Sequence, residues 1–72
     1  MNNKPTATQQ MGLEDAIRTN PNLQSHFDFS NLYEVIDKIT IGQYRFIYAL
    51  LFNKKYSQLN KILIQLGLKQ KI

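Results

Sequence analysis

The chain of 72 residues contains no cysteine and only one histidine, His26. Without cysteine it can form neither disulfide bonds nor zinc sites that depend on thiolates. A single imidazole cannot build a metal centre unless several carboxylates surround it. We therefore expect neither a disulfide nor a metal to support the fold, although a chain this short buries only about 60% of its unfolded surface. Small folds of this kind often gain stability from a partner or from a second copy of themselves.

Long apolar runs are also missing from the sequence. The longest, Phe46 to Phe52, has seven residues, whereas a membrane-spanning helix needs roughly 20. The first ten residues, MNNKPTATQQ, are polar and lack the apolar region of a secretory signal. These features predict a soluble, cytoplasmic protein with no membrane partner.

Acidic residues are absent from the second half of the chain. Residues 38–72 hold seven bases and no acid, whereas residues 1–37 hold two bases and five acids. The net charge of +4 is therefore the balance of −3 in the first segment and +7 in the second. An asymmetry of this kind predicts a polyanionic partner, or complementary packing between protomers.

The groups that catalysis requires are scarce. The chain has five carboxylates, one histidine and no thiol. Glu14 and Asp15 are neighbours and would point in different directions on a helix, so they do not form a paired-acid site. The three glycines, Gly12, Gly42 and Gly67, are isolated, and none belongs to a phosphate-binding loop. The sequence predicts no enzyme activity, no cofactor and no small-molecule substrate.

Apolar residues elsewhere recur with the period of an α-helix. Leu13, Ala16 and Ile17 indicate a first short helix, and Asn20 can cap a second that starts at Pro21. Two further stripes have the spacing i, i+3, i+4, i+7, with Ser30 and Ser57 as expected N-caps. They are Leu32, Val35, Ile36, Ile39 and Leu59, Ile62, Leu63, Leu66. We expect residues 1–9 to form a flexible arm and residues 10–72 to form one small helical domain.

The stretch between these two stripes allows two interpretations. Thr40-x-x-Gln43 has the form of a capping box, which favours a central helix from Ile41 to about Asn53, packed on several sides. Alternatively, a hairpin could turn at Gly42-Gln43, because aromatic residues alternate after it. The expected fold class is therefore all-α, a compact bundle of four or five short helices, with an α+β fold as the alternative.

Three apolar residues near the end of the chain lie outside the main stripe. Ile64, Leu68 and Ile72 are spaced i, i+4, i+8, and in a continuous helix they would form a second apolar line. Such a line would dock on a partner protein or on a second copy of the chain. The alternative is that Gly67 ends the helix and Leu68 folds back onto the core.

The second half of the chain also resembles a helix-turn-helix in its spacing. Ala49 would let the two helices cross closely, and Asn53 would adopt the left-handed conformation in the turn. Lysine can contact phosphates or guanine, and glutamine can contact adenine. The candidate nucleic-acid contacts are Lys54, Lys55, Gln58, Lys61 and Gln65.

Taken together, these features predict a non-catalytic small regulatory protein that acts by protein–protein binding. It would serve as an adaptor or inhibitor of a larger machine, and it could form a homo-oligomer such as a dimer. The alternative function is a DNA-binding or DNA-associated regulator.

Overall fold

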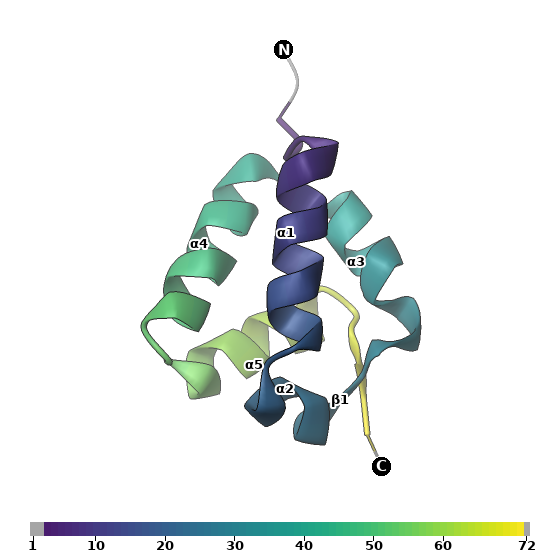
Figure 1. The fold of residues 1–72 in the computed structure, drawn as a ribbon, viewed down its shortest axis with the longest axis vertical. Helices are drawn as coiled ribbons and strands as arrows, with labels where there is room; N and C mark the ends of the chain where they lie inside the picture. The colour runs from purple at the N-terminus through teal and green to yellow at the C-terminus, as the bar shows by residue number, and fades with distance from the viewer. Residues whose placement is uncertain (1–2, 72) are drawn as a thin grey trace.

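The computed structural model describes residues 3–71 and is built almost entirely from helices. Its α-helices are α1 (Ala7–Arg18), α2 (Pro21–His26), α3 (Leu32–Lys38), α4 (Ile41–Phe52) and α5 (Tyr56–Gln65) (Figure 1). A 3-10 helix, η1 (Phe29–Asn31), and two short strands, β1 (Phe27–Asp28) and β2 (Lys69–Gln70), complete the described chain. The expected bundle of short helices is confirmed. The hairpin alternative is wrong, because Gly42 and Gln43 lie in the first turn of α4.

The helices α1 and α4 begin with the same device. The Thr6 hydroxyl accepts from the Gln9 N–H at 3.2 Å, and the Gln9 side chain accepts from the Thr6 N–H at 2.8 Å. Thr40 and Gln43 repeat this arrangement at 3.1 and 2.9 Å. Each capping box satisfies backbone donors that the first turn of a helix leaves without partners. The box at Thr40 was predicted from the sequence, and the one at Thr6 was overlooked.

The segment before α1 contacts the fold, and residues 7–9 of the predicted arm over residues 1–9 belong to that helix. α1 already begins at Ala7. Pro5 is buried, and the Asn3 carbonyl accepts from the Ile41 N–H at 2.5 Å. That contact gives a partner to a donor that the first turn of α4 cannot satisfy itself. Met1 lies outside the described residues.

One of the three predicted serine or asparagine caps is confirmed. Asn20 caps α2 with its side chain, but Ser30 and Ser57 do not cap α3 and α5. The Asp28 carboxylate accepts from the Ser30 N–H at 2.9 Å and so starts η1 before α3. α5 begins at Tyr56, one residue before Ser57, without a side-chain cap.

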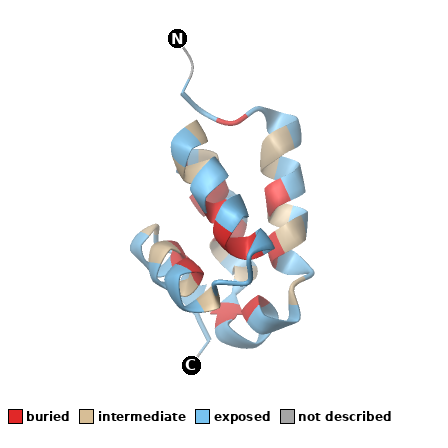
Figure 2. Cartoon of the chain, turned by 90° about the vertical axis from the view of Figure 1, so that its left-hand side faces the viewer, coloured by how far each residue is buried: buried red, intermediate tan, exposed pale blue. Residues whose placement is uncertain are grey.

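The core draws residues from all five α-helices, from β1 and from the segment after α5. α1 packs against α2 and α3, while α4 packs against α5. The predicted stripes supply most of the buried positions, although Ala16, Ile62 and Leu66 are only partly buried. The buried positions face the centre of the bundle (Figure 2). They are Leu13, Ile17, Leu23, Phe27, Leu32, Val35, Ile36, Ile39, Ile47, Leu50, Leu51, Leu59, Leu63 and Leu68.

The helix α5 ends in a reverse turn rather than running on to the end of the chain. The Leu68 N–H donates to the Leu63 carbonyl and the Gly67 N–H donates to the Ile64 carbonyl, both at 3.0 Å. Gly67 adopts a φ of 100°, and this pair of bonds is a Schellman motif. The predicted stop at Gly67 is confirmed. The continuous helix that would have aligned Leu68 with Ile72 is wrong, because Leu68 is only 3% exposed and belongs to the core.

After that turn the chain pairs with a segment from the first half of the fold. β2 lies antiparallel to β1, with Gln70 opposite Phe27. The Asn31 side chain holds the same segment, since its Nδ2 donates to the Gly67 carbonyl at 2.8 Å. Its Oδ1 accepts from the Lys69 N–H at 3.3 Å. The sequence analysis did not predict this ladder.

Candidate protein interface

α4 turns a large part of its apolar surface to solvent. Ile47, Leu50 and Leu51 are buried, but Phe52 is 82% exposed and Phe46 is 49% exposed. The sequence predicted that this helix would be packed on several sides, which is wrong. The reason is the size of the chain, because five short helices do not supply enough surface to surround a central one.

The exposed residues of α4 have a defined arrangement around the helix. At about 100° per residue, Gly42, Arg45 and Ala49 project from the middle of the exposed arc. Tyr48 and Phe52 lie on one side of them, and Phe46 lies on the other. We call these six residues the α4 face. It combines aromatic side chains at its edges with two small residues and one arginine in its middle. Figure 2 views the molecule from the side on which α4 lies.

One aromatic residue of the α4 face is held in place by the core. The rings of Tyr44 and Tyr48 meet edge to face, with centroids 5.4 Å apart and an interplanar angle of 68°. Tyr44 itself packs against the buried cluster. The Tyr48 ring therefore has a fixed support, which lowers the conformational entropy that a partner would have to remove on binding.

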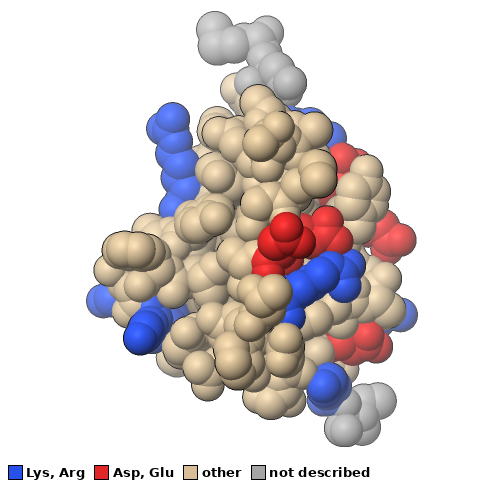
Figure 3. Space-filling model, in the orientation of Figure 1, with Lys and Arg blue, Asp and Glu red and all other residues tan. Residues whose placement is uncertain are grey.

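Positive charge surrounds the α4 face. Arg45 lies within it, and Lys54 and Lys55 form the turn that leads to α5. In Figure 3 the blue atoms at the left lie over α4 and this turn, with no red atoms among them. The ion pairs Lys4–Asp37 and Arg18–Glu14 lie on other elements. No acid occurs between Lys38 and Lys71, so the charge of this surface is not compensated by its own helices.

The turn after α4 has an unusual backbone conformation at Lys54. Its φ is 59°, a left-handed conformation that costs an ordinary L-residue about 1–2 kcal/mol. The sequence predicted this conformation for Asn53, which is wrong, since Asn53 has a φ of −87°. The turn closes α4, because the Lys54 N–H donates to the Leu51 carbonyl at 3.2 Å and the Lys55 N–H donates to the Leu50 carbonyl at 2.9 Å.

The predicted apolar line of Ile64, Leu68 and Ile72 does not form a surface. Ile64 is 38% exposed on α5 and remains available for contact. Leu68 is in the core, which corrects its assignment as an interface residue. Ile72 lies outside the described residues. The sequence analysis did not identify the aromatic residues of the α4 face as surface residues. The sequence nevertheless holds more aromatic residues than so small a core can bury.

The five candidate nucleic-acid contacts are all exposed. Three of them, Gln58, Lys61 and Gln65, lie on the outward side of α5, and Lys54 and Lys55 precede that helix. Ile64 interrupts this polar surface with an apolar side chain. Ala49 is exposed, so the prediction that α4 and α5 cross at Ala49 is wrong.

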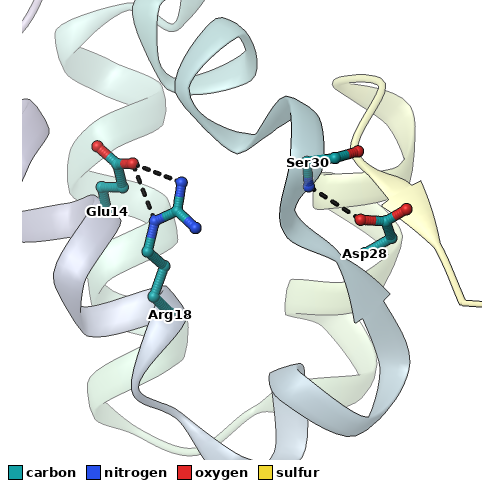
Figure 4. A network of polar contacts seen from close by, with 4 residues as sticks. All are labelled: Glu14, Arg18, Asp28 and Ser30. Atoms are coloured by element: carbon teal, nitrogen blue, oxygen red, sulfur yellow. Dashed lines mark hydrogen bonds and ion pairs between the residues drawn. The ribbon is translucent and has the colours of Figure 1, made fainter.

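A shallow hollow of about 430 Å³ lies between the end of α1, α2 and the strands. It is lined by Arg18, Gln24, Phe27, Asp28, Phe29 and Lys71. The Arg18 Nε and Nη2 donate to Glu14 at 2.9 and 2.8 Å (Figure 4). The Gln24 amide donates to the Arg18 carbonyl at 2.6 Å. Because these polar groups already form hydrogen bonds within the chain, the hollow offers a ligand fewer hydrogen-bonding partners than its lining residues suggest.

The Asp28 carboxylate beside this hollow is also used by the fold. The backbone N–H of Ser30, and then the Ser30 hydroxyl, hydrogen-bond to it and lower the pKa of Asp28 (Figure 4). A small loss of hydration raises the pKa of Asp28, while the charges of Lys69 and Lys71 lower it further, and the net direction is downward. The ionised form of Asp28 therefore stabilises the start of η1 and the approach of β2.

Within residues 3–71, histidine and carboxylate side chains do not gather in groups of three that could hold a metal ion. No helix in the same range combines the length and the apolar character that crossing a membrane requires. Comparisons with protein families, curated proteins and solved structures find no match to this chain. The geometry of the α4 face is therefore the main basis for an argument about function.

Proposed function

We propose that this chain is a non-catalytic regulatory protein that binds another protein through the α4 face. The observation that supports the proposal is the exposure of Phe46 and Phe52 on one helix of a chain that buries its other large apolar stripes. Exposed aromatic residues bounded by basic side chains are typical of binding surfaces, since aromatics and arginine are enriched where interfaces are most strongly stabilised.

The role that follows is that of an adaptor or an inhibitor of a larger assembly. A partner that covers Phe52 would remove most of a large ring from water, and truncating such an anchor typically costs about 2 kcal/mol or more. That loss corresponds to roughly a 30-fold change in Kd. The absence of cysteine suits a reducing compartment, so the cytoplasm remains the expected location.

The proposal is tested by affinity purification from the cells that make the protein, using two matched variants. Phe52→Ser removes an exposed aromatic from the α4 face, and Tyr33→Ser removes one that is 63% exposed on α3. Both should keep the circular dichroism spectrum of the wild type. We expect Phe52→Ser to lose the co-purifying protein and Tyr33→Ser to retain it, with and without nuclease. Titration of the identified partner in purified form then measures the affinity.

Two results would contradict the proposal. In the first, wild type and both variants retain the same proteins, which would mean that the α4 face is not the contact. In the second, nuclease removes the partner, which would indicate that nucleic acid bridges the two. Retention by Phe52→Ser combined with loss by Tyr33→Ser would move the binding surface to α3.

A DNA-associated role is the second candidate, supported by the exposure of all five predicted contacts around α5. Only Lys61 carries charge within the helix itself, which is a weak basis for reading a groove. The two candidates differ in their response to salt, because phosphate contacts make affinity fall steeply as salt rises. A gel-shift titration at low salt with wild type and Lys61→Glu tests this reading. Absence of binding at low salt would exclude it.

A further inference from the structure

We infer that the partner of the α4 face is an acidic amphipathic helix, whose apolar stripe lies over Ala49 and whose carboxylates meet Arg45 and Lys54. The inference rests on the proposed function and names the chemistry of the partner. It is supported by the charge and by the shape of the face.

The charge of the surface favours an acidic partner. Arg45 stands between Phe52 and Ala49 on the helix, and no carboxylate within the described residues forms an ion pair with it. A second copy of the chain that docked through the same face would supply no carboxylate to Arg45 or to the lysines, because α4 and the turn after it contain no acidic residue. Like charges at such an interface oppose binding, whereas a partner with acidic side chains compensates them.

The shape of the surface favours a helix. Gly42 and Ala49 leave two low positions on the middle of α4, one on each side of Arg45, and aromatic side chains border the Ala49 position. Helices pack by placing side chains of one into the gaps of the other, about 8–10 Å apart. An approaching helix with large apolar residues at i, i+3, i+4 and i+7 can place them over the small residues. Its flanking carboxylates then reach Arg45 within the α4 face and Lys54 at the end of the helix.

The backbone at Lys54 belongs to the end of α4. Its φ of 59° is that of the residue which closes a helix, and the hydrogen bonds from the Lys54 and Lys55 N–H groups hold the turn. Lys54 is therefore assigned to the contact by its charge and by its position at the end of the α4 face, and not by its backbone.

The probe for the test is a library of random 16-residue peptides displayed on phage and selected on the full chain. We expect the enriched peptides to be acidic and to carry apolar residues at helical spacing. Representative peptides are then synthesised, and their affinity is measured by fluorescence anisotropy at two salt concentrations. Binding should weaken as salt rises, because the contacts to Arg45 and Lys54 are partly screened.

Variants of the chain separate specific contacts from overall charge. Lys54→Gly should raise the thermal midpoint, because it relieves the backbone, while it weakens binding about two- to fivefold. Arg45→Gln should weaken binding by a similar factor. Lys61→Gln removes the same charge from α5 and should leave the affinity unchanged. Ala49→Gln should weaken binding about tenfold or more, because it fills the low position at this residue without altering charge.

Any result other than enrichment of acidic peptides with helical spacing overturns the inference. The different results also show whether the proposed function fails with it. Peptides that are neutral or basic but depend on Phe52 would refute the acidic partner and leave the proposed function intact. Peptides that bind Phe52→Ser as well as wild type would refute both. An empty selection also overturns the inference. In that case sedimentation that depends on concentration and on Phe52 would identify a second copy, and binding of oligo(dT) that depends on Phe52 would identify nucleic acid.

Discussion

The replacement of Leu68 by alanine tests whether the chain after α5 belongs to the core. Leu68 is 3% exposed, whereas Ile64, four residues earlier, is 38% exposed. Removing a buried leucine side chain typically costs about 2–5 kcal/mol. A chain of 72 residues has a total stability of about 4–11 kcal/mol at the usual value per residue. Leu68→Ala should therefore remove a large fraction of the stability, and Ile64→Ala should cost less than about 1 kcal/mol.

Urea unfolding followed by circular dichroism at 222 nm measures the difference directly. With an unfolding slope of about 1 kcal/mol/M, Leu68→Ala should lower the midpoint by about 2 M or more. Leu68→Asp should leave the chain largely unfolded even without urea, because it buries a carboxylate without a partner. A wild-type midpoint for Leu68→Ala would refute the docked position of this residue and return it to the surface. Equal losses of unfolding free energy for Leu68→Ala and Ile64→Ala would show that the two side chains do not differ in their contribution to the core.

Two further predictions concern backbone conformation and pH. Gly12→Ala should stabilise the chain by about 0.5–1 kcal/mol, since an added Cβ in this exposed turn of α1 meets no atom within 4 Å. Gly67→Ala should destabilise it by about 1 kcal/mol or more, because its φ is positive; equal thermal midpoints for the two variants would contradict this reasoning. The pKa of Asp28 is lower in the folded chain than its ordinary value near 4. The ionised carboxylate therefore stabilises the fold at a pH above that ordinary value. This stabilisation is lost as the pH falls through the lower pKa of the folded state. The difference in unfolding free energy between wild type and Asp28→Asn should therefore shrink as pH falls from 5 to 2, whereas a constant difference would contradict the role of the Ser30 hydrogen bonds.

Local sequence patterns predicted most of the helices. Leu32, Val35 and Ile36 are buried, as their spacing indicated. The capping box at Thr40 predicted a helix rather than a hairpin, and α4 begins there. These features depend on residues three or four positions apart, so the sequence records them directly. The Ser30 cap is wrong because the Asp28 carboxylate starts η1 at this point, and the Ser57 cap is wrong because α5 already begins at Tyr56.

The features that the sequence did not reveal depend on distant residues. The pairing of β1 with β2 involves strands of two residues, too short for any periodicity to appear. Burial of Leu68 follows from the turn at Gly67, and the Asn31 side chain supports it from across the fold. The α4 face was missed for a related reason. An all-round apolar pattern indicates burial, but only the number and length of the neighbouring helices decide how much of α4 they can cover.

The docking of β2 has a consequence for how the protein folds during synthesis. A ribosome releases the chain from its N-terminus, so α1 through α5 emerge before Leu68 and before the strand that pairs with Phe27. A nascent chain that lacks these residues has a gap in its core and an unpaired β1. The helices can form early, because they depend on local contacts, but the cooperative fold must wait for a closure that spans more than half of the sequence. Mutations in this last segment should therefore act on the yield of folded protein more strongly than the small size of the strand suggests.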